Sequence, residues 1–178
     1  MRIISGKHKG IRISAPKKLP VRPTTDMAKE ALFNILNNDY YLDDIVVLDL
    51  FSGIGSISLE FASRGTTDIT GVDIHRGCAR FLSDTARKYD FPIQTINADV
   101  YKFLKNQTKK YDVIFADPPY HFSDEQFAKI NSLVFDNNLL NEQGTLIIEH
   151  SKNTDLSSLQ NFAKVKKYGG NRFTFFEL

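Results

Sequence analysis

Three apolar segments rich in β-branched residues each end in an aspartate, and helical stretches separate them along the chain. Asp49 stands near the end of residues 45–50, Asp73 at the end of residues 68–73, and Asp99 just after residues 92–97. Strands that alternate with helices are typical of α/β folds with a parallel sheet. Because such sheets bind ligands at the carboxyl ends of their strands, we expect the three acids to share one site.

A glycine-containing turn follows the first of these segments. Gly53 and Gly55 permit a tight strand-to-helix turn in which the backbone comes close to a ligand. Ser58 stands where a dinucleotide-binding fingerprint has its third glycine, which disfavours a cofactor with a pyrophosphate. Asp49 would repel phosphates and attract a cation. The turn therefore predicts S-adenosylmethionine, which carries an ammonium and a sulfonium group but no phosphate.

The ends of the next two segments extend this prediction to the rest of the cofactor. Asp73 lies 20 residues after Gly53, the spacing at which a carboxylate meets a ribose hydroxyl. Ile74 follows it and is expected to lie against an adenine. Asp99 is expected to accept a hydrogen bond from the adenine amino group.

The tetrapeptide Asp117-Pro118-Pro119-Tyr120 follows another apolar segment, residues 113–116. Two successive prolines fix the backbone and make the loop rigid. The Asp117 carboxylate and the Pro118 carbonyl could then accept from one ligand group, with the Tyr120 ring beside them. Two acceptors and an aromatic face suit a planar group with an exocyclic NH2, such as a nucleobase. The alternative is that the prolines only end a strand and Tyr120 covers the core.

Positive charge is concentrated near the N-terminus. Residues 1–30 carry eight basic and two acidic side chains, a net charge of +6, whereas the remaining 148 residues carry a net charge of −4. This segregation predicts a polyanion-binding face on an acidic body, and the alternative is a solvated basic tail. The eight basic residues are Arg2, Lys7, Lys9, Arg12, Lys17, Lys18, Arg22 and Lys29.

The same basic region predicts a β-hairpin and a helix. Residues 2–5 and 10–14 look like strands around a basic tip, and a proline-containing connector follows them up to residue 24. Phosphate contacts from such an arm would give affinity with little base specificity. An amphipathic helix then begins after Thr25 or Asp26, and Arg22 and Thr24 precede it where polar atoms could reach a ligand.

The remaining features narrow the class of protein. Cys78 is the only cysteine, which excludes an internal disulfide and a thiolate metal cluster, and the four histidines lack ligand spacing. We therefore expect no metal. The start lacks a signal peptide, no apolar run could span a membrane, and a single cysteine suits a reducing cytoplasm. We expect a cytoplasmic protein that acts as a monomer. The 178 residues predict one domain, with residues 1–24 as basic hairpin and connector and residues 25–178 as catalytic core.

Taken together, these motifs resemble Rossmann-like S-adenosylmethionine-dependent methyltransferases, and specifically the bacterial 16S ribosomal RNA guanine-N2 methyltransferase family (RsmD type). The blocks that carry the resemblance are residues 2–10, 22–26, 30–36, 49–55, 117–120 and 149–150. The resemblance implies methyl transfer to the N2 amine of a guanine in small-subunit RNA, free or within an assembled subunit. It also implies a seven-stranded, mostly parallel sheet with one antiparallel strand, helices on both faces and a terminal hairpin at residues 162–168 and 171–177.

The resemblance assigns three sets of site residues. The catalytic set is Asp117, Pro118 and Tyr120. The cofactor set is Asp49, Phe51, Gly53, Gly55, Asp73, Ile74, Asp99, Val100, Arg22 and Thr24. The RNA-binding set is Arg2, Lys7, Lys9, Arg12 and Pro119.

Other functions remain open from the sequence. An amino-methyltransferase could act on DNA adenine, on a different RNA guanine or on a protein glutamine, although a glutamine methylase would not need the basic N-terminus. A catalytically silent RNA-binding assembly factor could keep the same fold. Such a factor would be expected to lose Asp117 or the Gly53 and Gly55 turn, and this chain has both.

Overall fold

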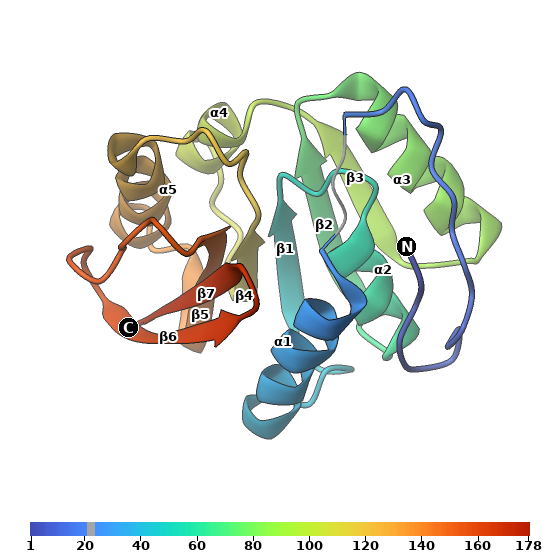
Figure 1. Cartoon of the computed structure of the whole chain (residues 1–178), viewed down its shortest axis with the longest axis horizontal. Helices are drawn as coiled ribbons and strands as arrows, with labels where there is room; N and C mark the ends of the chain where they lie inside the picture. Colours follow the sequence, from blue (N-terminus) through green and yellow to red (C-terminus); the bar gives the residue numbers. More distant parts are fainter. Residues whose placement is uncertain (21–23) are drawn as a thin grey trace.

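The computed structural model describes residues 1–20 and 24–178 of the chain. It consists of a seven-stranded sheet covered by helices (Figure 1). The strands are β1 Val46–Leu50, β2 Asp68–Asp73, β3 Ile93–Asn97, β4 Tyr111–Ala116, β5 Leu140–Ser151, β6 Phe162–Tyr168 and β7 Asn171–Glu177. The helices are α1 Asp26–Asp39, α2 Ser56–Ser63, α3 Arg76–Lys88, α4 Val100–Lys105 and α5 Asp124–Asp136.

The strand order in the sheet is β3-β2-β1-β4-β5-β7-β6. β7 is antiparallel to both of its neighbours, and the other pairs are parallel. The predicted mostly parallel sheet with one antiparallel strand is therefore confirmed. The order reverses between β1 and β4, so the chain leaves these two neighbouring strands in opposite directions, and ligand sites form at such a point.

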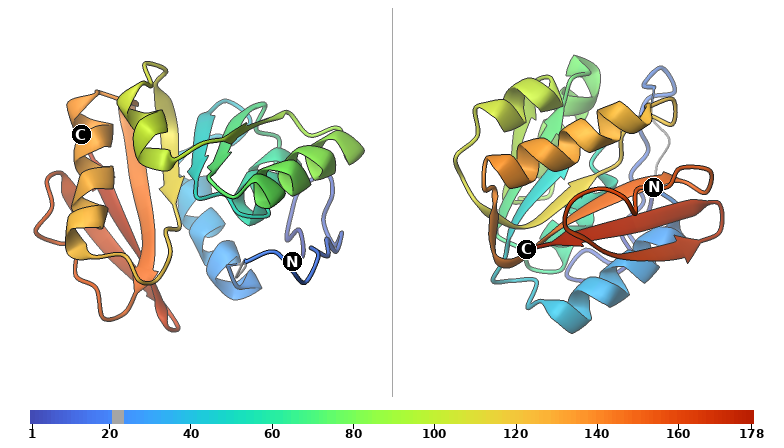
Figure 2. Two further views of the ribbon diagram at one scale, coloured as in Figure 1. Left: turned by 90° about the horizontal axis from the view of Figure 1, so that it is seen from above. Right: turned by 90° about the vertical axis from the view of Figure 1, so that its left-hand side faces the viewer.

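Helices cover both faces of the sheet, with α1 and α5 on opposite sides (Figure 2). On one face, α1 and α2 pack on alternate residues of the central strands, including Val47, Val113 and Ile147. On the other face, α4 and α5 pack on the intervening residues, including Leu48 and Ile114. This alternation follows from the strand period of two and explains why the central strands are apolar throughout.

The terminal hairpin has the predicted bounds, because β6 and β7 match residues 162–168 and 171–177. Phe173, Phe175 and Phe176 are at most 1% exposed, as expected for core residues. Helix α4 was not predicted. It has only six residues, too few for a recognisable amphipathic pattern, and the Asp99 side chain caps its start.

The predicted N-terminal β-hairpin is not confirmed as a pair of regular strands. The segment turns back on itself, and an isolated antiparallel bridge joins Arg2 and Arg12. Backbone bonds between its two arms run from the N–H of Ile3 to the carbonyl of Ile11 and from the N–H of Ile13 to the carbonyl of Met1, both at 3.0 Å. Backbone groups of the intervening residues bond to helix α2 instead. The N–H groups of Ile4 and Ser5 donate to Glu60 at 2.8 and 3.0 Å, and the N–H of Lys7 donates to the Ser63 carbonyl at 2.7 Å. The segment is therefore docked on α2.

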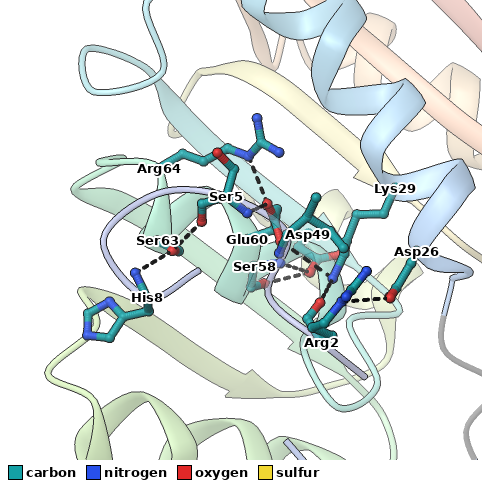
Figure 3. Close-up of polar contacts among 11 residues, drawn as sticks. Arg2, Ser5, His8, Asp26, Lys29, Asp49, Ser58, Glu60, Ser63 and Arg64 are labelled. Carbon is teal, nitrogen blue, oxygen red and sulfur yellow. Dashed lines mark hydrogen bonds and ion pairs between the residues drawn. The ribbon is translucent and has the colours of Figure 1, made fainter. Parts of the chain in front are cut away.

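Glu60 is the centre of this docking site and has no exposed surface (Figure 3). Its carboxylate accepts from Arg64 Nε at 2.9 Å and lies 3.5 Å from Lys29 Nζ. Lys29 also donates to the Arg2 carbonyl at 2.6 Å. Burial lowers the pKa of Lys29, and the charge of Glu60 partly offsets that effect. The cluster therefore joins α1, α2 and the N-terminal segment through buried charge.

Gly6 permits the close approach of this segment to α2. Its φ is +82°, and a Cβ added there would lie 1.8 Å from the Ser63 carbonyl oxygen. Both the backbone conformation and the contact exclude a side chain.

No helix in the described part of the chain is long and apolar enough to cross a membrane.

Glu60→Gln is expected to lower the free energy of unfolding by roughly 3 to 5 kcal/mol, because it leaves the Lys29 ammonium buried without a counter-charge. Adding Lys29→Met should recover part of this loss. Chemical denaturation of the single and double variants measures both effects.

Asp68→Asn serves as the control, because it breaks an exposed pair with Lys109 and should cost less than about 1 kcal/mol. A Glu60→Gln protein as stable as the parent would contradict the role assigned to the cluster.

Candidate functional site

The candidate site is a cleft of about 610 Å³ at the carboxyl ends of β1, β2 and β4. The loops that follow these three strands form most of its wall, and Pro20 and Thr24, which precede α1, also line it. A cleft of this size matches a small-molecule site, whose usual range is about 300 to 1,000 Å³. The cleft therefore lies at the ends of the strands, at the point where the strand order reverses.

Asp49 lies at the bottom of the cleft and is only 2% exposed. Its Oδ2 accepts from the backbone N–H of Ser58 at 3.1 Å and from the Ser58 hydroxyl at 2.5 Å. Burial raises the pKa of Asp49 to about 7, and the bonds from Ser58 oppose that rise. Asp49 therefore anchors the first turn of α2 and titrates near neutral pH.

The turn between β1 and α2 has left-handed backbone at Phe51 and Gly53, with φ values of +57° and +53°. Both residues line the cleft. Such a conformation is unusual for a phenylalanine and is found most often at functional sites. Gly55, in contrast, faces α3, because a Cβ added to it would lie 2.2 Å from Leu82 Cδ1. Among the described residues, Gly55 is not part of the cleft wall.

Asp73 and Ile74 line the cleft from the end of β2. The Asp73 carboxylate accepts from the N–H of Gly53 at 2.8 Å and from the N–H of His75 at 2.7 Å. These bonds tie the loop after β1 to the loop after β2. The Asn97 amide donates to the carbonyls of Asp73 and Ile74, which holds the 66% exposed Ile74 side chain at the edge of the cleft.

Asp117, Pro118, Pro119 and Tyr120 all line the cleft from the end of β4. Asp117 is half-buried, Pro118 is buried, and Tyr120 is 50% exposed. The N–H of Asp117 donates to the carbonyl of Leu50 at 3.4 Å, which sets the loop beside the end of β1. The tetrapeptide is therefore open to a ligand rather than a cover for the core.

A network of polar side chains behind this loop was not predicted. The Tyr120 hydroxyl donates to Asn171 Oδ1 at 3.5 Å, and Asn171 Nδ2 donates to Glu149 Oε1 at 2.5 Å. The Thr24 hydroxyl donates to the other oxygen of the buried Glu149 at 3.3 Å. The network thus connects Tyr120 to the wall at Thr24. Asn171 has no local signal in the sequence, since it follows a glycine turn far from the other residues.

Several predicted site residues lie elsewhere. Asp99 Oδ1 accepts from the N–H of Lys102, and Val100 is buried in the core, so within the described ranges neither lines the cleft. Arg22 lies outside the described residues. In the described part of the chain, the predicted RNA-binding residues of the N-terminal segment do not line the cleft, and they are Arg2, Lys7, Lys9 and Arg12. Arg2 pairs with Asp26 of α1, and the segment packs on α2 and α3 through Ile3 and Ile13.

The cleft also includes residues that the motifs did not single out. Ser52, Ile54 and Ser56 belong to the same turn as Gly53, so a broader reading of that turn would have found them. His75 and Cys78 come from the start of α3. Burial raises the pKa of the Cys78 thiol to about 11, so the thiol is neutral at physiological pH.

Comparisons with known proteins agree with this geometry. The family described as "Conserved hypothetical protein 95" matches residues 1–177. Ribosomal RNA small subunit methyltransferase D of Buchnera aphidicola subsp. Baizongia pistaciae is 33% identical over 84% of this chain and 75% of its own length. A putative methyltransferase from Escherichia coli has the same fold, with a TM-score of 0.87, 24% identity, and 99% and 97% of the two chains covered.

A more distant structure shares the fold of the core. It is a Thermus thermophilus 16S rRNA N2 methyltransferase in complex with AdoMet and guanosine, with a TM-score of 0.72 and 19% identity. The similarity covers 89% of this chain and 45% of that one. The sheet order and the cleft define the class of Rossmann-like methyltransferases. Within that class, the chain belongs to the family of ribosomal RNA small subunit methyltransferase D proteins.

The raised pKa of Asp49 predicts a specific dependence of stability on pH. The folded state binds the Asp49 proton more tightly than the unfolded state does, because its pKa is about 7 and an unperturbed aspartate titrates near pH ~4. The free energy of unfolding should therefore fall as pH rises from about 4 to about 7, by about 1.4 kcal/mol per unit of pKa difference.

Asp49→Asn removes this titration and keeps an acceptor for Ser58. The difference in stability between the variant and the parent should grow in favour of the variant across this pH range and then level off. Denaturant unfolding at a series of pH values measures it, and parallel profiles for the two proteins would exclude the raised pKa.

Proposed function

We propose that this protein transfers the methyl group of S-adenosylmethionine to the exocyclic N2 amine of a guanine in 16S ribosomal RNA. One observation carries the proposal: Asp117, Pro118 and Tyr120 share a cleft with Asp49, Gly53 and Asp73. Acceptors for an amine thus lie beside acids suited to a cationic cofactor. The named relatives of the family support the RNA substrate.

The residues of the cleft fit S-adenosylmethionine. Asp49 would hold the ammonium group, because a cation nearby favours the charged carboxylate despite its burial. Asp73 accepts two backbone bonds, and a carboxylate has about four acceptor sites, so it can also accept from ribose hydroxyls. The exposed Ile74 side chain offers an apolar surface to the adenine.

The remaining cofactor assignments are also proposals. Phe51 and Thr24 line the cleft and would contact the cofactor there. Gly55 would act indirectly, since it lets α3 approach the turn. Asp99 and Val100 follow β3, where the capping role of Asp99 leaves further acceptor sites for an adenine amino group. Arg22 keeps its assignment from the sequence alone.

When bound, the cofactor supplies a methyl group already activated by the sulfonium. The N2 amine of guanine is a poor nucleophile because its lone pair is delocalised into the ring. Asp117 and the Pro118 carbonyl would accept its two hydrogens, which favours rehybridisation and stabilises the positive charge that develops on nitrogen. Tyr120 would stack on the splayed-out base, with Pro119 beside it. The protein's main contribution is then in-line positioning.

The N-terminal segment suits a large polyanionic substrate. Lys7, Lys9 and Arg12 are exposed, and Arg2 is partly neutralised by Asp26 at 3.1 Å. We propose that the segment contacts RNA phosphates of the small subunit, either as free RNA or in an assembled particle. We further propose that the chain acts as one methyltransferase domain, as a monomer, in the cytoplasm.

Asp117→Ala is expected to reduce methyl transfer by at least about 10²-fold, the usual cost of removing one preorganised hydrogen-bonding group from a transition state. Cofactor binding should change little. Asp117→Asn keeps a carbonyl acceptor at the same place and should retain more activity than the alanine variant. Transfer of labelled methyl and calorimetric titration with S-adenosylmethionine separate the two effects, and full activity in the alanine variant would overturn the mechanism.

The substrate is tested by offering labelled S-adenosylmethionine with small subunits that lack guanine-N2 methylation, with free 16S RNA and with DNA. We expect N2-methylguanosine on nucleoside analysis of the RNA, in the free or assembled form, and no label in DNA. Methyladenine in DNA would support the alternative amino-methyltransferase. Bound cofactor without transfer to any substrate would support the silent assembly factor.

A further inference from the structure

Helix α3 presents a row of cations to solvent. Arg76, Arg80 and Arg87 are exposed and lie within about 40° of one another around the helix, at about 100° per residue. Lys88 is exposed at the C-terminal end of the helix, about 80 to 120° around the helix axis from these three arginines. Asp84 is the acid on this face, 3.7 Å from Arg80 and 3.9 Å from Arg87.

These cations contribute little to the fold. The opposite face of α3 packs in the core through Cys78, Leu82 and Ala86, whereas the Arg80 and Arg87 side chains are 83% and 80% exposed. Ion pairs as exposed as those with Asp84 are worth between about 0 and 1 kcal/mol. The row is therefore available to an external partner.

The row begins at the candidate site and ends at the N-terminal segment. At its start, His75 caps α3 and lines the large cleft. At its end, a second cleft of about 230 Å³ separates α3 from the N-terminal segment, which runs beside the helix (Figure 1). A helix of 13 residues is about 20 Å long. The row thus connects the mouth of the candidate site to the basic segment.

The second cleft has the chemistry of a nucleotide site. Arg12 of the N-terminal segment and Lys88 of α3 supply positive charge, and the rings of Phe81 and Tyr89 also line the cleft. Cations for a phosphate next to rings for a base are the features of single-stranded nucleic acid binding. Asp84 also lines this cleft and weakens its positive potential.

We propose that the exposed side of α3 binds the RNA backbone on one side of the target nucleotide. Arg76, Arg80 and Arg87 form its row of cations, and Lys88 turns toward the second cleft and Arg12 of the N-terminal segment. The inference rests on the proposed function, since it names how that RNA is held. A strand that leaves the large cleft along α3 meets a cation near each end of the helix and reaches the second cleft.

The test is the triple variant Arg80→Gln, Arg87→Gln and Lys88→Gln, which leaves the large cleft intact. Binding to 16S RNA is measured by fluorescence anisotropy at several salt concentrations. The plot of log affinity against log salt should become shallower by roughly two to three, at about 0.7 to 0.9 for each lost phosphate contact. Affinity for S-adenosylmethionine should be unchanged.

Two further variants test whether RNA binding depends on the cations of α3 or on positive charge anywhere on the protein surface. Lys105→Gln, Lys110→Gln and Lys166→Gln remove the same number of exposed positive charges from α4, the start of β4 and β6, and should leave the slope unchanged. Asp84→Asn removes the acid and should tighten RNA binding, with a steeper slope. A triple α3 variant that binds RNA like the parent, or a control variant that weakens binding equally, would overturn the inference.

The assay also distinguishes this inference from the proposed function. A shallower salt dependence in the α3 variant, with no N2-methylguanosine formed by the parent, would support RNA binding by α3 and reject the proposed methyl transfer. Methylation by the parent, with unchanged RNA binding in the α3 variant, would support the proposed methyl transfer and reject RNA binding by α3. A parent protein that binds no RNA would reject both.

Discussion

The reversal of strand order between β1 and β4 is the constraint on which the rest of the structure depends. Crossovers between parallel strands are right-handed, so the chain from β1 must pass over one face of the sheet and the chain from β4 over the other. The loops after the two strands therefore diverge and leave a cleft between them. The glycine turn after β1 and the Asp117-Pro118-Pro119-Tyr120 loop after β4 meet there for this reason.

Helix α2 joins this cleft to the surface that faces RNA in the proposed function. Its first turn is held by the buried Asp49, through Ser58. Its later residues, Glu60 and Ser63, hold the N-terminal segment. One short helix thus ties the floor of the candidate site to the basic arm, and buried carboxylates fix it from both ends. Movement of the arm relative to the cleft would require these buried contacts to break.

Much of the fold and part of the site could be predicted from the sequence. It could be predicted that the strand ends at Asp49, Asp73 and Asp117 lie together, because parallel strands bring their carboxyl ends to one edge of the sheet. Asp99 shows the limit of that rule, since its carboxylate caps the unpredicted α4. Asn171 and Glu149 show another limit. Their contact with Tyr120 depends on β7 inserting beside β5, which no local pattern reveals.

The sequence by itself determined the α/β class, the order of strands and helices along the chain and the restricted backbone of the turn and the tetrapeptide, because these follow from local periodicity and backbone restriction. Only the tertiary structure showed the second group of cations, on α3. The net charge of −4 beyond residue 30 concealed the cations of α3, because a sum over sequence ignores which side chains share a face. It likewise decided that Glu60 of α2 holds the N-terminal segment through the backbone N–H groups of Ile4 and Ser5.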